Sequence, residues 1–104
     1  MNNAKTELLN TLENKPRVKC AKLITGYEWD EDDQTLYLLK VGYTEKELED
    51  FLKSIDFDYD NGFGEQNLFG TLWFEDGTWL SRGEYDGSEW WEYNIVPELP
   101  SEII

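Results

Sequence analysis

The spacing of apolar residues predicts two helices. Residues 3–14 carry a narrow apolar stripe at helical spacing, formed by Ala4, Leu8, Leu9 and Leu12. This helix ends at Lys15-Pro16, because a residue that precedes proline disfavours the helical conformation. Residues 45–54 predict a second helix, in which Thr44 is the N-cap and Glu47 completes a capping box. Its apolar face consists of Leu48, Phe51, Leu52 and Ile55.

Alternating and aromatic-rich stretches predict five strands. Residues 17–28 and 35–41 form a hairpin across the polar loop 29–34, and we expect a bulge near residues 20–23, where the apolar positions change parity. The strands of a C-terminal meander are 68–75, 78–85 and 88–96. They are separated by two Asp-Gly pairs, which favour tight hairpin turns because these residues tolerate positive φ.

The order of these elements, α-β-β-α-β-β-β, predicts a single α+β domain with a mostly antiparallel sheet of about five strands. Its parts are an N-terminal helix (1–15), a hairpin (17–41), a helix (44–55), the meander (68–96) and an extended tail (97–104). Residues 56–67 are expected to form a polar loop.

The charge of the chain is strongly negative and uneven. The 104 residues carry a net charge of −14, and residues 54–104 contain 12 acids against the single base Arg82. This balance disfavours direct binding to nucleic acid or to an anionic membrane, because both need patches of Lys and Arg. It favours either a solvated surface without a particular partner or a partner with a basic groove.

The composition gives little support to catalysis. The chain has no His and one Cys, so it holds no Ser-His or Cys-His pair, no disulfide of its own and no usual zinc site. We expect no enzyme and no cofactor. The lone Cys20 and the absence of an apolar leader favour a reducing cytoplasm. We expect Arg82 to pair with Glu84, Glu75 or Glu92 on neighbouring strands.

Clusters of acids are the candidate partner-binding residues. Together with an exposed meander tryptophan as anchor, they give the predicted set Asp30, Glu31, Asp32, Asp33, Asp56, Asp58, Asp60, Glu84, Asp86, Glu89, Trp90 and Trp91. Adjacent strand residues point to opposite faces, so Trp90 and Trp91 need two covered faces, unless one of them is offered to a partner or stacks on a sugar.

The loop 56–65 offers an alternative, a calcium or ligand site with Asp56, Asp58, Asp60 and Glu65 as the metal-binding residues. Its start is similar to an EF-hand loop. It departs from that pattern because Asn61 stands where the glycine is needed and Asn67 where a bidentate Glu is needed. The other interpretation is a polar loop anchored to the core by its aromatic residues.

The meander segment WFEDGTWLSRGEYDGSEWWEY resembles the C-terminal segment of small acidic proteins from phages and mobile elements. The matching residues are Trp73, Asp76, Gly77, Thr78, Trp79, the run 82–87, Trp90 and Trp91. In size and acidity the chain is also similar to phage anti-defence proteins, including anti-CRISPR proteins and DNA mimics. This likeness implies a non-enzymatic inhibitor that blocks a basic nucleic-acid-binding surface of a host nuclease complex, and it assigns no site residue.

Overall fold

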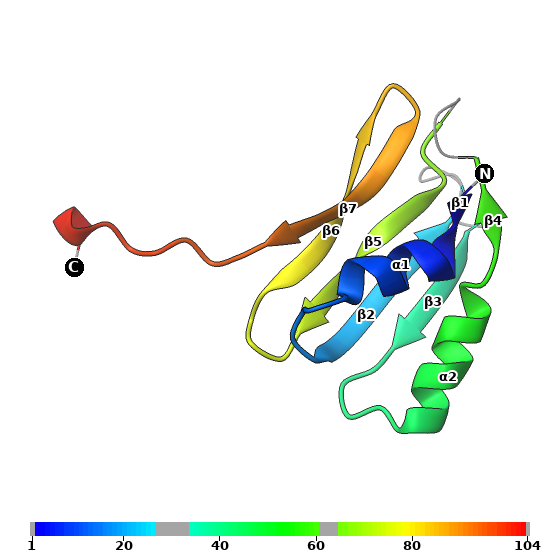
Figure 1. The fold of residues 1–104 in the computed structure, drawn as a ribbon, viewed down its shortest axis with the longest axis horizontal. Helices are drawn as coiled ribbons and strands as arrows, with labels where there is room; N and C mark the ends of the chain where they lie inside the picture. The colour runs from blue at the N-terminus through cyan, green and yellow to red at the C-terminus, as the bar shows by residue number, and fades with distance from the viewer. Residues whose placement is uncertain (1, 27–33, 61–64, 104) are drawn as a thin grey trace.

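The computed structural model describes residues 2–26, 34–60 and 65–103 and confirms the predicted α+β fold (Figure 1). A five-stranded antiparallel sheet has the order β3-β2-β5-β6-β7. Its strands are β2 (Val18–Thr25), β3 (Thr35–Leu39), β5 (Leu68–Phe74), β6 (Trp79–Tyr85) and β7 (Ser88–Asn94). The helices are α1 (Ala4–Leu12) and α2 (Glu45–Ser54). None of the described helices is long and apolar enough to cross a membrane.

Local sequence signals account for the helix starts. In α2 the Thr44 hydroxyl accepts from the backbone N–H of Glu47 at 3.1 Å, and the Glu47 carboxylate accepts from the backbone N–H of Thr44 at 3.0 Å. The predicted capping box is therefore confirmed. In α1 the cap is Asn3, whose side-chain oxygen accepts from the backbone N–H of Thr6 at 3.0 Å.

The strands follow the predicted hairpins closely. At the turn between β6 and β7, Asp86 and Gly87 both have positive φ, 52° and 86°, as a tight hairpin turn requires. The bulge lies between Val18 and Cys20, where the pairing of β2 with β5 shifts register, immediately before the region in which we expected it. It puts Ala21 and Leu23 on the same face of the sheet as Leu39.

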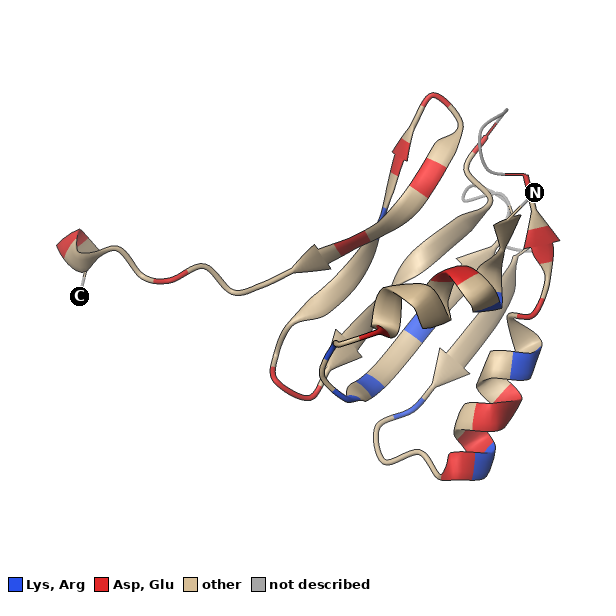
Figure 2. Cartoon of the chain, viewed as in Figure 1, with Lys and Arg blue, Asp and Glu red and all other residues tan. Residues whose placement is uncertain are grey.

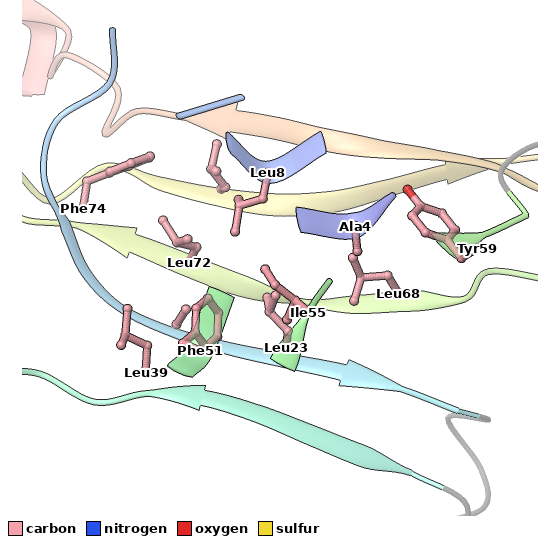
Figure 3. Packing of buried hydrophobic residues seen from close by; sticks show 12 residues of the cluster. Ala4, Leu8, Leu23, Leu39, Phe51, Ile55, Tyr59, Leu68, Leu72 and Phe74 are labelled. Atoms are coloured by element: carbon pink, nitrogen blue, oxygen red, sulfur yellow. The ribbon is translucent and has the colours of Figure 1, made fainter. Parts of the chain in front are cut away.

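The two helices lie on one face of the sheet, which we call the inner face (Figures 1 and 3). Ala4 and Leu8 of α1 and Phe51 of α2 pack there against strand residues of β2, β3, β5 and β6. The fully buried strand residues of this core are Ala21, Leu23, Leu39, Leu68, Leu72, Phe74 and Leu80. Among the described residues no helix covers the opposite face, which we call the open face.

A second, two-stranded sheet departs from the prediction. We expected residues 56–67 to form a loop, but β4 (Asp58–Tyr59) pairs antiparallel with β1 (Asn2–Asn3). The side-chain amide of Asn3 donates to the carboxylates of Asp56 and Asp58 at 2.9 and 3.0 Å, which ties the chain start to this segment. The two strands pair residues that are 55 or more positions apart in sequence, so no local sequence pattern predicts the pairing.

The C-terminal tail leaves the sheet after β7. It runs away from the rest of the molecule and ends in a short 3₁₀ turn, η2 (Ser101–Ile103) (Figure 1). Its apolar side chains are exposed, with Ile95, Val96, Leu99 and Ile103 between 62% and 68% accessible. The extended tail that we predicted is present, and it does not fold back on the inner face.

Candidate functional site

Arg82 forms a buried polar centre beneath α1. The Arg82 side chain is only 2% exposed and lies on the inner face of β6. Its guanidinium donates to Glu7 of α1 at 2.6 Å and to Glu89 of β7 at 2.7 Å. The Nε–H of Arg82 also donates a hydrogen bond to the carbonyl oxygen of Leu68 at 3.3 Å. The buried Glu89 and the partly buried Glu7 thus share one cation, so the centre is held by charge-assisted hydrogen bonds.

Glu89 is an inner member of this centre and not a surface residue. Its side chain is 0% exposed, and its two oxygens accept from the backbone N–H groups of Leu68 and Asn67 at 2.9 and 2.7 Å. The prediction that Glu89 contacts a partner from an exposed position is therefore wrong. So is the expectation that Arg82 pairs with Glu84, Glu75 or Glu92, because its carboxylate partners are Glu7 and Glu89.

Tyr59 links the small sheet to this centre. Its hydroxyl donates to the Glu7 carboxylate at 2.7 Å and accepts from Arg82 at 3.1 Å. Burial, followed by the hydrogen bond to Glu7, raises the pKa of Tyr59 to about 12, so the phenol remains a donor at neutral pH. Burial alone would lower the pKa of Arg82, but its bonds to Glu89, Tyr59 and Glu7 raise it. Through these hydrogen bonds the centre connects α1, β4, β6 and β7.

The two neighbouring tryptophans point to different faces. Trp91 is half-buried on the inner face, where its ring lies 4.8 Å from the Arg82 guanidinium carbon and caps the buried centre. Trp90 lies on the open face, 38% exposed, and its indole N–H donates to Glu92 at 3.0 Å. Of the predicted pair, Trp90 is the exposed one and can serve as an anchor for a partner.

Acidic residues gather at one end of the sheet. Because the strands are antiparallel, this end holds the end of β2, the start of β5 and the β6–β7 turn. It carries exposed Asp58 and Asp60 after α2 and exposed Glu84 and Asp86 at the β6–β7 turn, visible as red segments in Figure 2. We call these four residues, together with Glu65, the acidic end. Exposed Asp56 lies two residues before β4.

Part of the predicted acidic surface cannot be placed. Asp30, Glu31, Asp32 and Asp33 lie outside the described residues, in the connection between β2 and β3. The bases are distributed differently (Figure 2): Arg17 and Lys19 lie near the opposite end of β2, Lys22 lies at the middle of β2, and Lys40 follows β3.

A cavity of about 530 Å³ opens beside β4. Its walls combine the aromatic rings of Tyr37 and Phe57 with the carboxylates of Asp58, Asp60 and Glu65. Gln66 and Asn67 add amide groups. Aromatic surface with a few convergent polar groups is the usual lining of a small-molecule site.

The metal-binding alternative gains no support from the carboxylates that can be seen. Within residues 2–26, 34–60 and 65–103, no three His, Cys, Asp or Glu side chains are grouped so that they could hold a metal ion. Asp56 and Asp58 face the amide of Asn3, which is a donor and would have to be displaced by a cation.

The arrangement is suited to recognition by surface charge and aromatic contact. The buried Arg82 centre holds the inner face together, and the acidic end and the open face present exposed groups. Comparison with known proteins adds no further assignment, since no family model, no curated protein and no solved structure matches the chain.

Proposed function

We propose that the protein is a non-enzymatic binding protein that presents its acidic end to a basic surface of a partner. The observation that carries the proposal is the convergence of acids from β4, the start of β5 and the β6–β7 turn at one end of the sheet. Two bases, Lys5 on the first turn of α1 and Lys53 on the last turn of α2, only partly offset the negative charge of these acids. Concentrated charge of one sign steers association with an oppositely charged surface.

The partner is proposed to be a protein with a basic nucleic-acid-binding groove. Such grooves are lined by Lys and Arg that neutralise regularly spaced phosphates. A rigid acidic end can occupy the same groove and exclude the nucleic acid. Inhibition of a host nuclease complex by a phage protein of the anti-CRISPR or DNA-mimic kind is the specific form of this proposal, and the bulk charge of −14 supports it.

Charge reversal at the acidic end tests the proposal. The double substitution Asp60→Lys and Glu65→Lys changes two exposed carboxylates that make no side-chain ion pair among the described residues. We expect it to weaken binding to a purified partner about tenfold or more and to reduce the salt dependence of binding. Affinity is measured by titration at several salt concentrations, after capture of the partner from a bacterial lysate and its identification.

A charge-matched control separates the acidic end from the bulk charge. Glu49→Lys with Asp50→Lys makes the same change of net charge on the exposed side of α2. This control should change affinity by less than about twofold. Equal weakening by both variants, or binding that nucleic acid does not compete away, would contradict the proposal.

A second candidate is binding of a cation or small polar ligand in the cavity beside β4. The polar and aromatic residues that line the cavity favour the small polar ligand, whereas no group of three possible metal-binding side chains occurs among the described residues. A bound ion should raise the melting temperature by mass action at low concentration. Melts with calcium are therefore compared with melts in magnesium and sodium at equal ionic strength. If all three salts give the same shift, screening explains it and the cation site is rejected.

A further inference from the structure

The open face of the sheet carries several exposed apolar side chains. Residues of one parity on the five strands point to this face, as the pairing of Lys22 with Leu38 and of Trp73 with Trp79 shows. Its exposed apolar residues are Leu36, Leu38, Trp73 and Trp90, between 38% and 53% accessible. The indole of Trp90 lies against Gly83, where an added Cβ would come within 2.6 Å of its Nε1. Lys22, Thr71, Ser81 and Glu92 form a polar row across this face, with Trp73 on one side of the row and Leu36 and Trp90 on the other. Exposed apolar side chains on a face that no described helix covers favour an interaction site.

The open face also carries charged side chains and a cavity. Exposed Lys22 lies on β2 and Lys40 follows the β3 edge, whereas exposed Glu92 lies beside Trp90 on β7. A cavity of about 370 Å³ at one end is lined by Lys19, Cys20, Val41, Trp73 and Glu75, among others. The β2–β3 side of the face, where the lysines lie, therefore suits a segment that alternates aliphatic and acidic side chains.

The C-terminal tail of the same chain has this pattern. Ile95, Val96, Leu99 and Ile103 are exposed, and Glu98 and Glu102 lie among them. Pro97 and Pro100 keep the segment extended and remove two backbone donors, so the tail is suited to docking by its side chains. Figure 1 shows it directed away from its own sheet, which leaves both complementary surfaces of the chain unoccupied.

We propose that two copies of the chain dimerise by exchanging tails, each tail (residues 95–103) lying across the open face of the other copy. A reciprocal exchange of this kind makes a closed, two-fold symmetric dimer. Nine extended residues reach about 30 Å. Five strands at their usual spacing are about 19 Å across. Leu99 and Ile103 enter the apolar face and its cavity, and Glu98 and Glu102 pair with Lys22 and Lys40.

Sedimentation of the 104-residue chain over roughly 1–100 µM, the affinity range of small interfaces, tests the exchange. The mass should rise with concentration from 12.3 kDa toward twice that value. Leu99→Asp with Ile103→Asp should raise the dimer dissociation constant by about tenfold or more. Both residues are exposed on the tail, so the fold should be retained, as far-UV circular dichroism would verify.

A charge swap identifies the surface that the tail contacts. Lys22→Glu with Lys40→Glu should weaken the dimer, and adding Glu98→Lys with Glu102→Lys should restore it. The matched control, Lys46→Glu with Lys53→Glu on α2, should leave it unchanged. The proposal is overturned if the wild type stays monomeric over this range or if the swap restores nothing. It is also overturned if the tail variant alters tryptophan emission without any concentration dependence, since the tail then covers its own sheet.

Discussion

Replacing Arg82 with methionine is expected to destabilise the fold by about 3–5 kcal/mol, the range measured when one partner of a buried ion pair is removed. The guanidinium is 2% exposed, and both of its carboxylate partners are held away from water, Glu89 fully and Glu7 with 18% exposure. Without the cation, the buried Glu89 carboxylate and the partly buried Glu7 carboxylate lose their shared positive charge, and the neutral donors Tyr59 and the backbone N–H groups of Asn67 and Leu68 replace it only in part. The loss is measured by urea unfolding followed by tryptophan fluorescence.

An exposed ion pair of the same protein provides the control. Lys46 and Asp50 on α2 are 3.6 Å apart with side chains 81% and 57% exposed, and such pairs contribute less than about 1 kcal/mol. Lys46→Met should therefore cost little. If Arg82→Met and Lys46→Met lower the free energy of unfolding by similar amounts, the buried centre does not hold the fold together.

A rescue variant separates the unpaired charge from the lost packing. Adding Glu7→Gln and Glu89→Gln to Arg82→Met removes both uncompensated charges and keeps the side-chain length. Part of the stability should return, because neutral amides cost less to bury than carboxylates. Recovery should be incomplete, since Glu89 uses both oxygens to accept from the backbone N–H groups of Asn67 and Leu68.

Local patterns predicted the elements of the fold because their causes are local. The capping box at Thr44, the turn at Asp86-Gly87 and the helix end before Pro16 each depend on residues within a few positions of one another. The sheet order of the meander follows from its short turns. The pairing of Asn2–Asn3 with Asp58–Tyr59 could not be predicted in this way, because its two strands are far apart in sequence.

The same distinction explains the errors at Arg82 and Glu89. From the sequence we expect Arg82 to pair with acids of the meander strands, but its contact with Glu7 spans 75 positions and depends on α1 crossing the inner face. One usable signal was strand parity, since Glu89 and Trp91 share a face and Arg82 pairs directly with Trp91. An acid on the same face as a half-buried tryptophan is a candidate for burial with a cation. The acidic composition of the segment, considered without strand parity, groups Glu89 with the surface acids.

Gly70 is the position where a single methyl group is expected to have the next largest effect. It lies in the middle of β5 with φ +134°, opposite Leu23 of β2. A Cβ at this position would come within 2.3 Å of the carbonyl oxygen of Lys22 and 2.7 Å of the Leu23 Cα. Both atoms belong to the backbone of the neighbouring central strand, so they cannot move aside as a flexible side chain could. Gly70→Ala should cost about 3 kcal/mol or more.

Gly42→Ala separates the contribution of the backbone angle from that of the collision. Gly42 also has a positive φ, +81°, but an added Cβ there meets nothing within 4 Å. Its substitution should therefore show only the conformational cost, about 1–2 kcal/mol. Urea unfolding of both variants gives the difference directly. If the two losses are equal, β2 and β5 can separate to admit a side chain, and their close approach at Gly70 is not what fixes the register of the two central strands.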